Sequence, residues 1–243
     1  QEYMHSVTKG LAPMFIIIAV ISGLIGVQPD LGATAVIIAI AMGVLFLGGL
    51  DGKIFTAVLI LAIAIGFSMI YLSPWRLERM ISYWDVWGNA YGKGYQLSHS
   101  LIAFGRGEWF GVGLGASIEK LHYLPESHTD FIMAVIGEEL GFVGVVVVVV
   151  AFYFFVRRAF AIGRQSIKLD RVFPGLVAEG VGIWIGFQAI INLGVATGMF
   201  PTKGLTLPFV SYGGSSLIAT IAAVALLLRV DRENRILMRG GRV

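Results

Sequence analysis

Residues 131–156 read FIMAVIGEELGFVGVVVVVVAFYFFV, and they give the clearest indication of the fold class. It includes six consecutive valines, from Val145 to Val150. In water such a run would indicate a buried strand, but 26 residues with uncharged ends are long enough for a helix that crosses a bilayer. An isolated strand would leave its backbone polar groups unsatisfied in lipid. We therefore predict a lipid-facing helix here.

Apolar runs of similar length recur along the chain. They cover residues 11–27, 31–50, 54–72, 173–197 and 209–230. The composition agrees, with 57% hydrophobic residues, 14% charged residues, no Cys and a mean hydropathy of +0.83. Soluble domains carry about 25% charged residues, so an ordinary cytosolic enzyme, a disordered chain and a disulfide-stapled secreted module are excluded. The sequence predicts an all-α polytopic membrane protein, a single domain over residues 1–243 with six transmembrane helices and a large outer loop at 73–130.

The basic residues orient these spans. The net charge is only +3 although the sequence pI is about 9.2. Segments on one face hold twelve basic and five acidic residues, against six basic and seven acidic on the other. Loops rich in Lys and Arg remain in the cytoplasm, so both ends of the chain are predicted to be cytoplasmic and the long loop external. The basic pI is thus a topology signal, and no nucleic-acid partner is predicted.

The long loop is expected to carry function, because connections of this length are seldom plain linkers. Its charges are balanced and it is rich in aromatic residues. Leu97, Leu101 and Phe104 recur at i, i+4 and i+7, which predicts a short amphipathic helix lying on the membrane surface.

The end of the loop brings two carboxylates and an imidazole together in the sequence, at Glu126, His128 and Asp130. At the outer membrane interface such groups could act as a base or as metal ligands on a lipid-linked substrate. The alternative is structural, because Ser127 and Asp130 have the spacing of a capping box before an apolar run. Both interpretations stay open at this point.

Two further carboxylates, Glu138 and Glu139, lie about 12 Å deeper along the predicted helix. Carboxylates inside a membrane are costly and usually face a cavity or a partner. They could line an intramembrane cavity and serve transport, or they could form a structural ion pair.

A second polar segment, residues 201–216, contains two prolines and three glycines at membrane depth. It predicts a broken or re-entrant segment. A cation beside free backbone N–H groups at a helix start could bind a phosphate or pyrophosphate. The alternative is a tight turn from which Lys203 reaches water. The residues that would form the anion site are Lys203, Ser211, Tyr212, Gly213, Gly214 and Ser215.

Several motifs in order resemble the SEDS family of bacterial membrane glycosyltransferases, and within it the cell-division branch. These motifs are Gly94–Gln96, Ser100–Gly105, Gly113–Gly115, Tyr123–Ile132, Glu138–Gly141 and Pro201–Ser216. The resemblance covers nearly the whole chain. Since members have about ten spans, it implies the C-terminal part of a longer enzyme that needs its preceding spans for activity. His122 departs from the pattern, which often has an acidic residue there.

The resemblance implies polymerisation of lipid II into glycan strands for septal wall synthesis, in the bacterial cytoplasmic (inner) membrane at the division septum. Asp130 matches the catalytic aspartate of the family, and Glu126 and His128 join the segment containing Lys203 as substrate-binding residues. A divalent cation, Mg²⁺ or Mn²⁺, could lie there or near Asp130, and no organic cofactor is expected. The expected partners are lipid II, a class B penicillin-binding transpeptidase and other division membrane proteins. A lipid II flippase and a non-catalytic division scaffold are the alternative functions.

Overall fold

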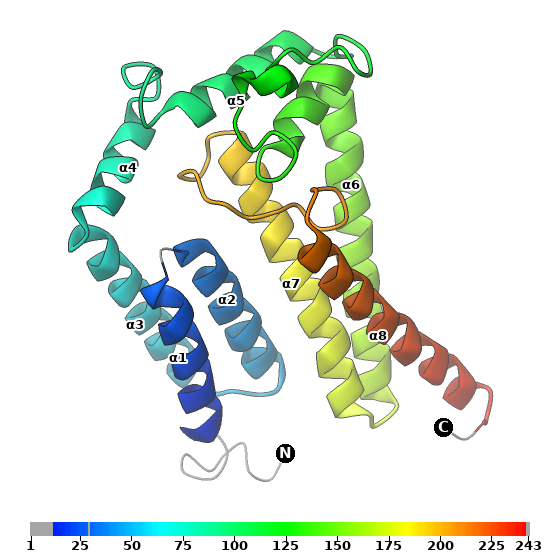
Figure 1. The fold of residues 1–243 in the computed structure, drawn as a ribbon. Coiled ribbons are helices and arrows are strands. Elements are labelled where there is room, and N and C mark those ends of the chain that lie inside the picture. Colours follow the sequence, from blue (N-terminus) through cyan, green and yellow to red (C-terminus); the bar gives the residue numbers. More distant parts are fainter. Residues whose placement is uncertain (1–11, 29, 242–243) are drawn as a thin grey trace. The chain divides into compact units, whose positions relative to one another are not determined.

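The computed structural model describes residues 12–28 and 30–241. Over these ranges the chain is helical and contains no strand, which confirms the predicted all-α class. In order along the chain (Figure 1), the elements are α1 (Ala12–Val27), α2 (Leu31–Leu47), α3 (Gly52–Tyr71), α4 (Pro74–Trp84), α5 (Tyr95–Gly107), the single wide turn η2 (Glu119–Tyr123), α6 (Ile132–Lys168), α7 (Val172–Ala196) and α8 (Gly214–Met238).

Four of these helices, α3, α6, α7 and α8, are long and apolar enough to cross a membrane. The other two apolar helices are shorter, with 16 residues in α1 and 17 in α2. The run predicted at 31–50 stops being helical at Leu47 because Gly48 and Gly49 form a turn, with Gly49 at φ 101°. The run predicted at 11–27 begins at Leu11, which lies outside the described residues.

Two helices extend beyond their predicted apolar ends. α6 continues twelve residues past residue 156 to Lys168, and α8 continues past residue 230 to Met238. In α8 the polar extension is supported by the ion pairs Arg229–Glu233 and Asp231–Arg235, both at i, i+4 spacing. Hydropathy cannot detect such an extension, since the helix continues where its apolar surface ends.

α8 also begins later than residue 209, at Gly214, because residues 208–211 form a turn.

The contacts divide the chain into two compact units. The first, here called the terminal unit, contains the described residues up to Ser68 together with Arg157–Trp184 and the described residues from Ala223 onward. Within it, α6 and α7 approach closely at Gly163 and Gly175, where an added Cβ would meet a carbonyl oxygen of the other helix at 2.8 Å and 2.9 Å. Small residues permit this close packing of membrane helices.

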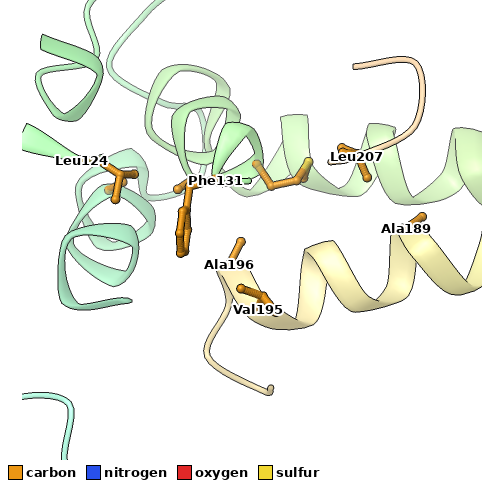
Figure 2. Packing of buried hydrophobic residues seen from close by; sticks show 9 residues of the cluster. Leu124, Phe131, Ala189, Val195, Ala196 and Leu207 are labelled. Carbon is orange, nitrogen blue, oxygen red and sulfur yellow. The ribbon is translucent and has the colours of Figure 1, made fainter. Parts of the chain in front are cut away.

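The second, here called the loop unit, contains Met69–Val156 and Ile185–Ala222. Its core joins the end of the long loop and the start of α6 to the end of α7 (Figure 2). Phe131, which directly follows Asp130, is only 2% exposed within this core. The buried residues of the core are Ala103, Leu124, Phe131, Met133, Ala134, Ala189, Val195, Ala196 and Leu207.

The amphipathic helix predicted in the long loop exists as α5, and the side that carries Leu97 and Phe104 packs against protein instead of lipid. Leu97 is 2% exposed and Phe104 packs against the core of the loop unit. Ser100 also donates a hydrogen bond to the carbonyl oxygen of Ala196 at the end of α7, at 2.6 Å. The apolar face of α5 is therefore covered by protein, because burying it against α7 removes it from water as effectively as lipid would.

α6 is broken at Gly141, which has φ 67° and ψ −164°, a conformation essentially restricted to glycine. Two helical hydrogen bonds are lost there, and the loop replaces them. The N–H groups of Phe142 and Val143 donate to the carbonyls of Glu108 and Trp109, at 2.9 Å and 3.2 Å. In return, the carbonyls of residues 138 and 139 accept from the N–H groups of residues 112 and 113 at 2.9 Å and 3.1 Å. The loop is thus locked to the break.

We expect Gly141→Ala to lower the free energy of unfolding by about 2–4 kcal/mol, since the methyl group adds both backbone strain and overlap with the loop backbone. The measurement is thermal unfolding of the purified protein in detergent. Gly105→Ala is the matched control, because Gly105 lies in α5 with nothing within 4 Å of an added Cβ. Equal unfolding temperatures for the two variants would contradict this account of the break.

Candidate functional site

The segment that carries Asp130 is a series of turns in which one backbone carbonyl accepts two hydrogen bonds. The N–H groups of Thr129 and Phe131 both donate to the carbonyl of Glu126, at 3.2 Å and 3.1 Å, and Glu126 has the left-handed φ of 58°. α6 begins only at Ile132. The capping-box interpretation of Ser127 and Asp130 is therefore wrong, because the turns place both residues before the first helical turn.

The second predicted segment, residues 201–216, is non-helical up to Gly213, where α8 begins with the next residue, and this part folds against these turns. Ser211 donates its hydroxyl hydrogen to the carbonyl of Thr129 at 2.5 Å, and the N–H of Tyr212 donates to the carbonyl of His128 at 2.9 Å. The hydroxyl of Ser211 also accepts from the N–H of Leu207 at 2.7 Å. The structure therefore brings together the two polar segments that the sequence singled out separately.

Asn192 of α7 forms hydrogen bonds to both segments. Its side-chain amide donates to the carbonyl of Asp130 at 2.9 Å and to the carbonyl of Leu205 at 2.6 Å. Asn192 is 1% exposed. The sequence analysis missed this residue, although a polar amide inside an apolar run is a usable signal, because such a group in a membrane helix needs a partner.

Asp130 is a partly exposed residue, and its carboxylate lies beside Gly204 and Arg79. A Cβ added to Gly204 would stand 3.1 Å from Oδ2 of Asp130. The guanidinium of Arg79 in α4 donates from Nε to the hydroxyl of Thr202 at 3.1 Å. Burial lowers the pKa of Arg79 from its ordinary value, and the charge of Asp130 opposes that shift. Arg79, also missed from the sequence, supplies positive charge to the site.

A hollow of about 490 Å³ is built from the two segments and the wide turn η2, and its lining reaches Thr129, the residue before Asp130. Tyr212 stands at its edge with 80% of its surface exposed. His122 and Glu126 line it with left-handed φ angles of 74° and 58°. Strained residues of this kind cluster at binding sites. The lining residues are Lys120, His122, Leu124, Pro125, Glu126, Ser127, His128, Thr129 and Tyr212.

The structure places the residues predicted to form an anion site in different environments. Lys203 is partly buried. Its neighbours in the sequence are Thr202, which Arg79 contacts, and Gly204, which lies beside Asp130. The hydroxyl of Ser211 is used within the fold, as described above. Gly213 is partly buried, while Gly214 and Ser215 are exposed in the first turn of α8.

The deep carboxylates are paired with the loop. Glu138 is fully buried and accepts from Arg106 and from the hydroxyl of Ser117, both at 2.5 Å. Glu139 forms an ion pair with Lys120 at 2.5 Å. Neither glutamate lines the hollow that reaches Thr129. In this arrangement both act as anchors for the loop.

A divalent cation finds no set of protein ligands in the part of the chain that the structure describes. No group of three or more His, Cys, Asp or Glu side chains among those residues could hold a metal ion. A hard cation needs several oxygen ligands, so the described residues do not form a metal site by themselves.

These features define the class of protein. A helical chain with several helices of membrane-spanning length, and a structured polar loop that presents a carboxylate beside a hollow, is a polytopic membrane protein with a candidate active site. A family model described as cell cycle protein, for FtsW, RodA and SpoVE, matches residues 1–236. The chain belongs to this family, which confirms the resemblance found from its motifs.

Relatives and solved structures that resemble the chain agree with this family assignment. The probable peptidoglycan glycosyltransferase FtsW of Burkholderia thailandensis is 61% identical over 100% of this chain and 53% of its own length, and that of Polynucleobacter necessarius is 60% identical over 100% and 58%. The chain therefore spans little more than half the length of these relatives. A peptidoglycan synthase complex that coordinates polymerization and crosslinking matches with 29% identity and a TM-score of 0.75, over 96% of this chain and 64% of the other. Thermus thermophilus RodA matches with 28% identity and a TM-score of 0.59, over 96% and 61%.

We expect Asn192→Ala to loosen both site segments, because two buried carbonyls lose their donor at a cost of about 1–3 kcal/mol each. The measurement is hydrogen exchange, which should speed up at residues 128–131 and 204–206. Thr197→Ala is the control, since the hydroxyl of Thr197 bonds only to carbonyls of α7, those of Leu193 and Gly194. Unchanged exchange at both segments in Asn192→Ala would show that the amide does not hold them.

Proposed function

We propose that the full-length protein containing this chain is a peptidoglycan glycosyltransferase, which polymerises lipid II into glycan strands during septal wall synthesis. The single observation that carries the proposal is the position of Asp130, a partly exposed residue that lies beside the cationic Arg79 and directly after Thr129, which lines a hollow of about 490 Å³. The names of the relatives support the same activity.

We propose that α1, α2, α3, α6, α7 and α8 all cross the cytoplasmic membrane, with residues 73–130 outside and both ends of this chain in the cytoplasm. α1 and α2 would be about 24–26 Å long, slightly less than the roughly 30 Å hydrocarbon core. Local thinning of the bilayer accommodates such a mismatch at modest cost. The chain would then be the C-terminal part of a membrane domain of about ten spans.

In the proposed reaction a sugar hydroxyl of the acceptor attacks the anomeric carbon of the donor. The carboxylate of Asp130 takes the hydroxyl proton as the new carbon–oxygen bond forms. The bond from the anomeric carbon to the lipid pyrophosphate breaks, and the pyrophosphate leaves with its electron pair. Asp130 suits the base role because Asn192 and the turn at Glu126 fix its backbone on both sides.

The leaving pyrophosphate requires positive charge, and the chain offers it close to Asp130. Arg79 and Lys203 flank the segment around Gly204, and the exposed first turn of α8 adds backbone N–H donors. Preorganised donors of this kind stabilise developing negative charge. No step is assigned to Mg²⁺ or Mn²⁺, because the described residues do not form a metal site.

The hollow lined by Tyr212, Glu126 and His128 suits a sugar ring. An exposed aromatic face can stack on the apolar face of a pyranose, while carboxylate and imidazole groups bond its hydroxyls. We assign this hollow to the saccharide part of lipid II or of the growing strand.

A class B penicillin-binding transpeptidase and other division membrane proteins are the proposed partners. The structural similarity to a synthase complex that couples polymerization to crosslinking supports a crosslinking partner. The flippase alternative is supported less, because Glu138 and Glu139, the carboxylates on which it depends, are engaged by Arg106 and Lys120. A scaffold alone would not require a carboxylate beside a polar hollow.

We expect Asp130→Asn in the full-length protein to reduce glycan polymerisation about 10²- to 10⁴-fold, the usual contribution of a general base. Product formation from purified lipid II measures this. Asp85→Asn is the control, because Asp85 is an exposed carboxylate that accepts from Gly88 within its own turn. Wild-type polymer from Asp130→Asn would refute the catalytic assignment, and flipping that persists while polymerisation is lost would separate the two activities.

We expect Tyr212→Ala to raise the KM for lipid II about three- to tenfold with a smaller change in kcat, because a stacking contact of up to 1.5 kcal/mol is lost. Steady-state kinetics with purified lipid II would measure both constants. Tyr91→Ala is the matched control, since Tyr91 is a fully exposed tyrosine of the long loop that lines no part of the hollow. Equal effects of the two substitutions would remove Tyr212 from the saccharide site.

A further inference from the structure

Two neighbouring hollows lie at the polar ends of α6 and α8, within the terminal unit. Their volumes are about 360 Å³ and 350 Å³. The first is lined by Arg158, Gln165, Asp231, Arg235, Met238 and Arg239. The second is lined by Leu228, Asp231, Arg232, Arg235, Ile236 and Arg239. The two hollows therefore share Asp231, Arg235 and Arg239.

Two of the four arginines of this pair of hollows form ion pairs with one shared carboxylate, which does not neutralise them. Asp231 accepts from Arg158 at 3.0 Å and from Arg235 at 2.8 Å, yet both arginine side chains remain more than half exposed. The linings together contain four arginines and one aspartate, a surplus of three positive charges. The neighbouring carboxylate of Glu233 is engaged by Arg171 and Arg229 and lines neither hollow. An anion with more than one charge is the matching ligand.

Apolar residues lie beside these charges. Leu228 lines the second hollow and is 61% exposed on α8, directly before the polar extension of the helix begins at Arg229. Met238 and Ile236 add apolar surface to the two linings. A small soluble anion would gain nothing from Leu228, whereas a lipid offers a phosphate to the arginines and an acyl chain to the leucine.

We propose that the ends of α6 and α8 bind the headgroup of an anionic phospholipid with two phosphodiester groups, one in each hollow. Bidentate arginine contacts suit phosphate oxygens, and basic pockets between membrane helices are suited to such headgroups. By the orientation proposed above, the lipid lies in the cytoplasmic leaflet. The site is separate from glycosyl transfer and does not depend on Asp130.

The test is native mass spectrometry of the full-length protein with cardiolipin, phosphatidylglycerol or phosphatidylcholine. Cardiolipin should bind most tightly. Arg239→Gln should weaken its binding about fivefold, and Arg235→Gln with Arg239→Gln about 25-fold, since each arginine near an anionic lipid contributes a similar increment. Arg157→Gln is the matched control, because Arg157 is an exposed arginine on α6 that lines neither hollow; it should change binding less than twofold.

Folding is checked by thermal unfolding in phosphatidylcholine nanodiscs, where the variants should match the wild type. If the double variant unfolds, Arg239→Gln by itself tests the lipid site. This single substitution should not disturb folding, because Arg239 takes part in none of the ion pairs found among the described residues. Equal losses in Arg157→Gln and Arg239→Gln would overturn the site. Phosphatidylglycerol binding as tightly as cardiolipin would overturn the two-phosphate assignment, and displacement of cardiolipin by an Asp-rich peptide at equal concentration would overturn the lipid assignment.

Discussion

Backbone polar groups that leave a membrane helix must find other partners, and in this chain that requirement organises the loop unit. The break at Gly141 frees the N–H groups of Phe142 and Val143, and the loop carbonyls of Glu108 and Trp109 receive them. Lipid offers no hydrogen bonds, so the exchange ties the long loop to α6 more firmly than side-chain contacts alone would. The position of the loop relative to α6, and with it the position of Asp130, follows from this exchange.

The sparse charges of the loop unit act together with that backbone exchange. Glu138 and Glu139 would be costly in an apolar environment, but Arg106, Ser117 and Lys120 satisfy them from the loop. The side-chain amide of Asn192 similarly donates hydrogen bonds to two backbone carbonyls of the site. Each buried polar group therefore fixes a segment of irregular backbone, so the loop carries a defined hollow.

Charge has a different role in the terminal unit. There the ion pairs of Asp231 and Glu233 extend α6 and α8 beyond their apolar segments and leave a surplus of exposed arginine. The two units thus present different chemistry: a carboxylate and a hollow that we assign to a sugar in the loop unit, and arginine-lined hollows that we assign to phosphates in the terminal unit.

The sequence alone determined the helical class, the approximate location of each apolar helix, the family, and the two segments at 126–130 and 201–216 that carry the candidate site. These follow from local composition and order, which each residue carries with it. Tertiary structure alone decided that α5 is covered by protein, that Ser127 and Asp130 precede α6 instead of capping it, and that Arg79 and Asn192 belong to the site. Arg79 and Asn192 lie 51 and 62 residues from Asp130 along the chain, and no local pattern can report a contact that forms only when distant segments pack.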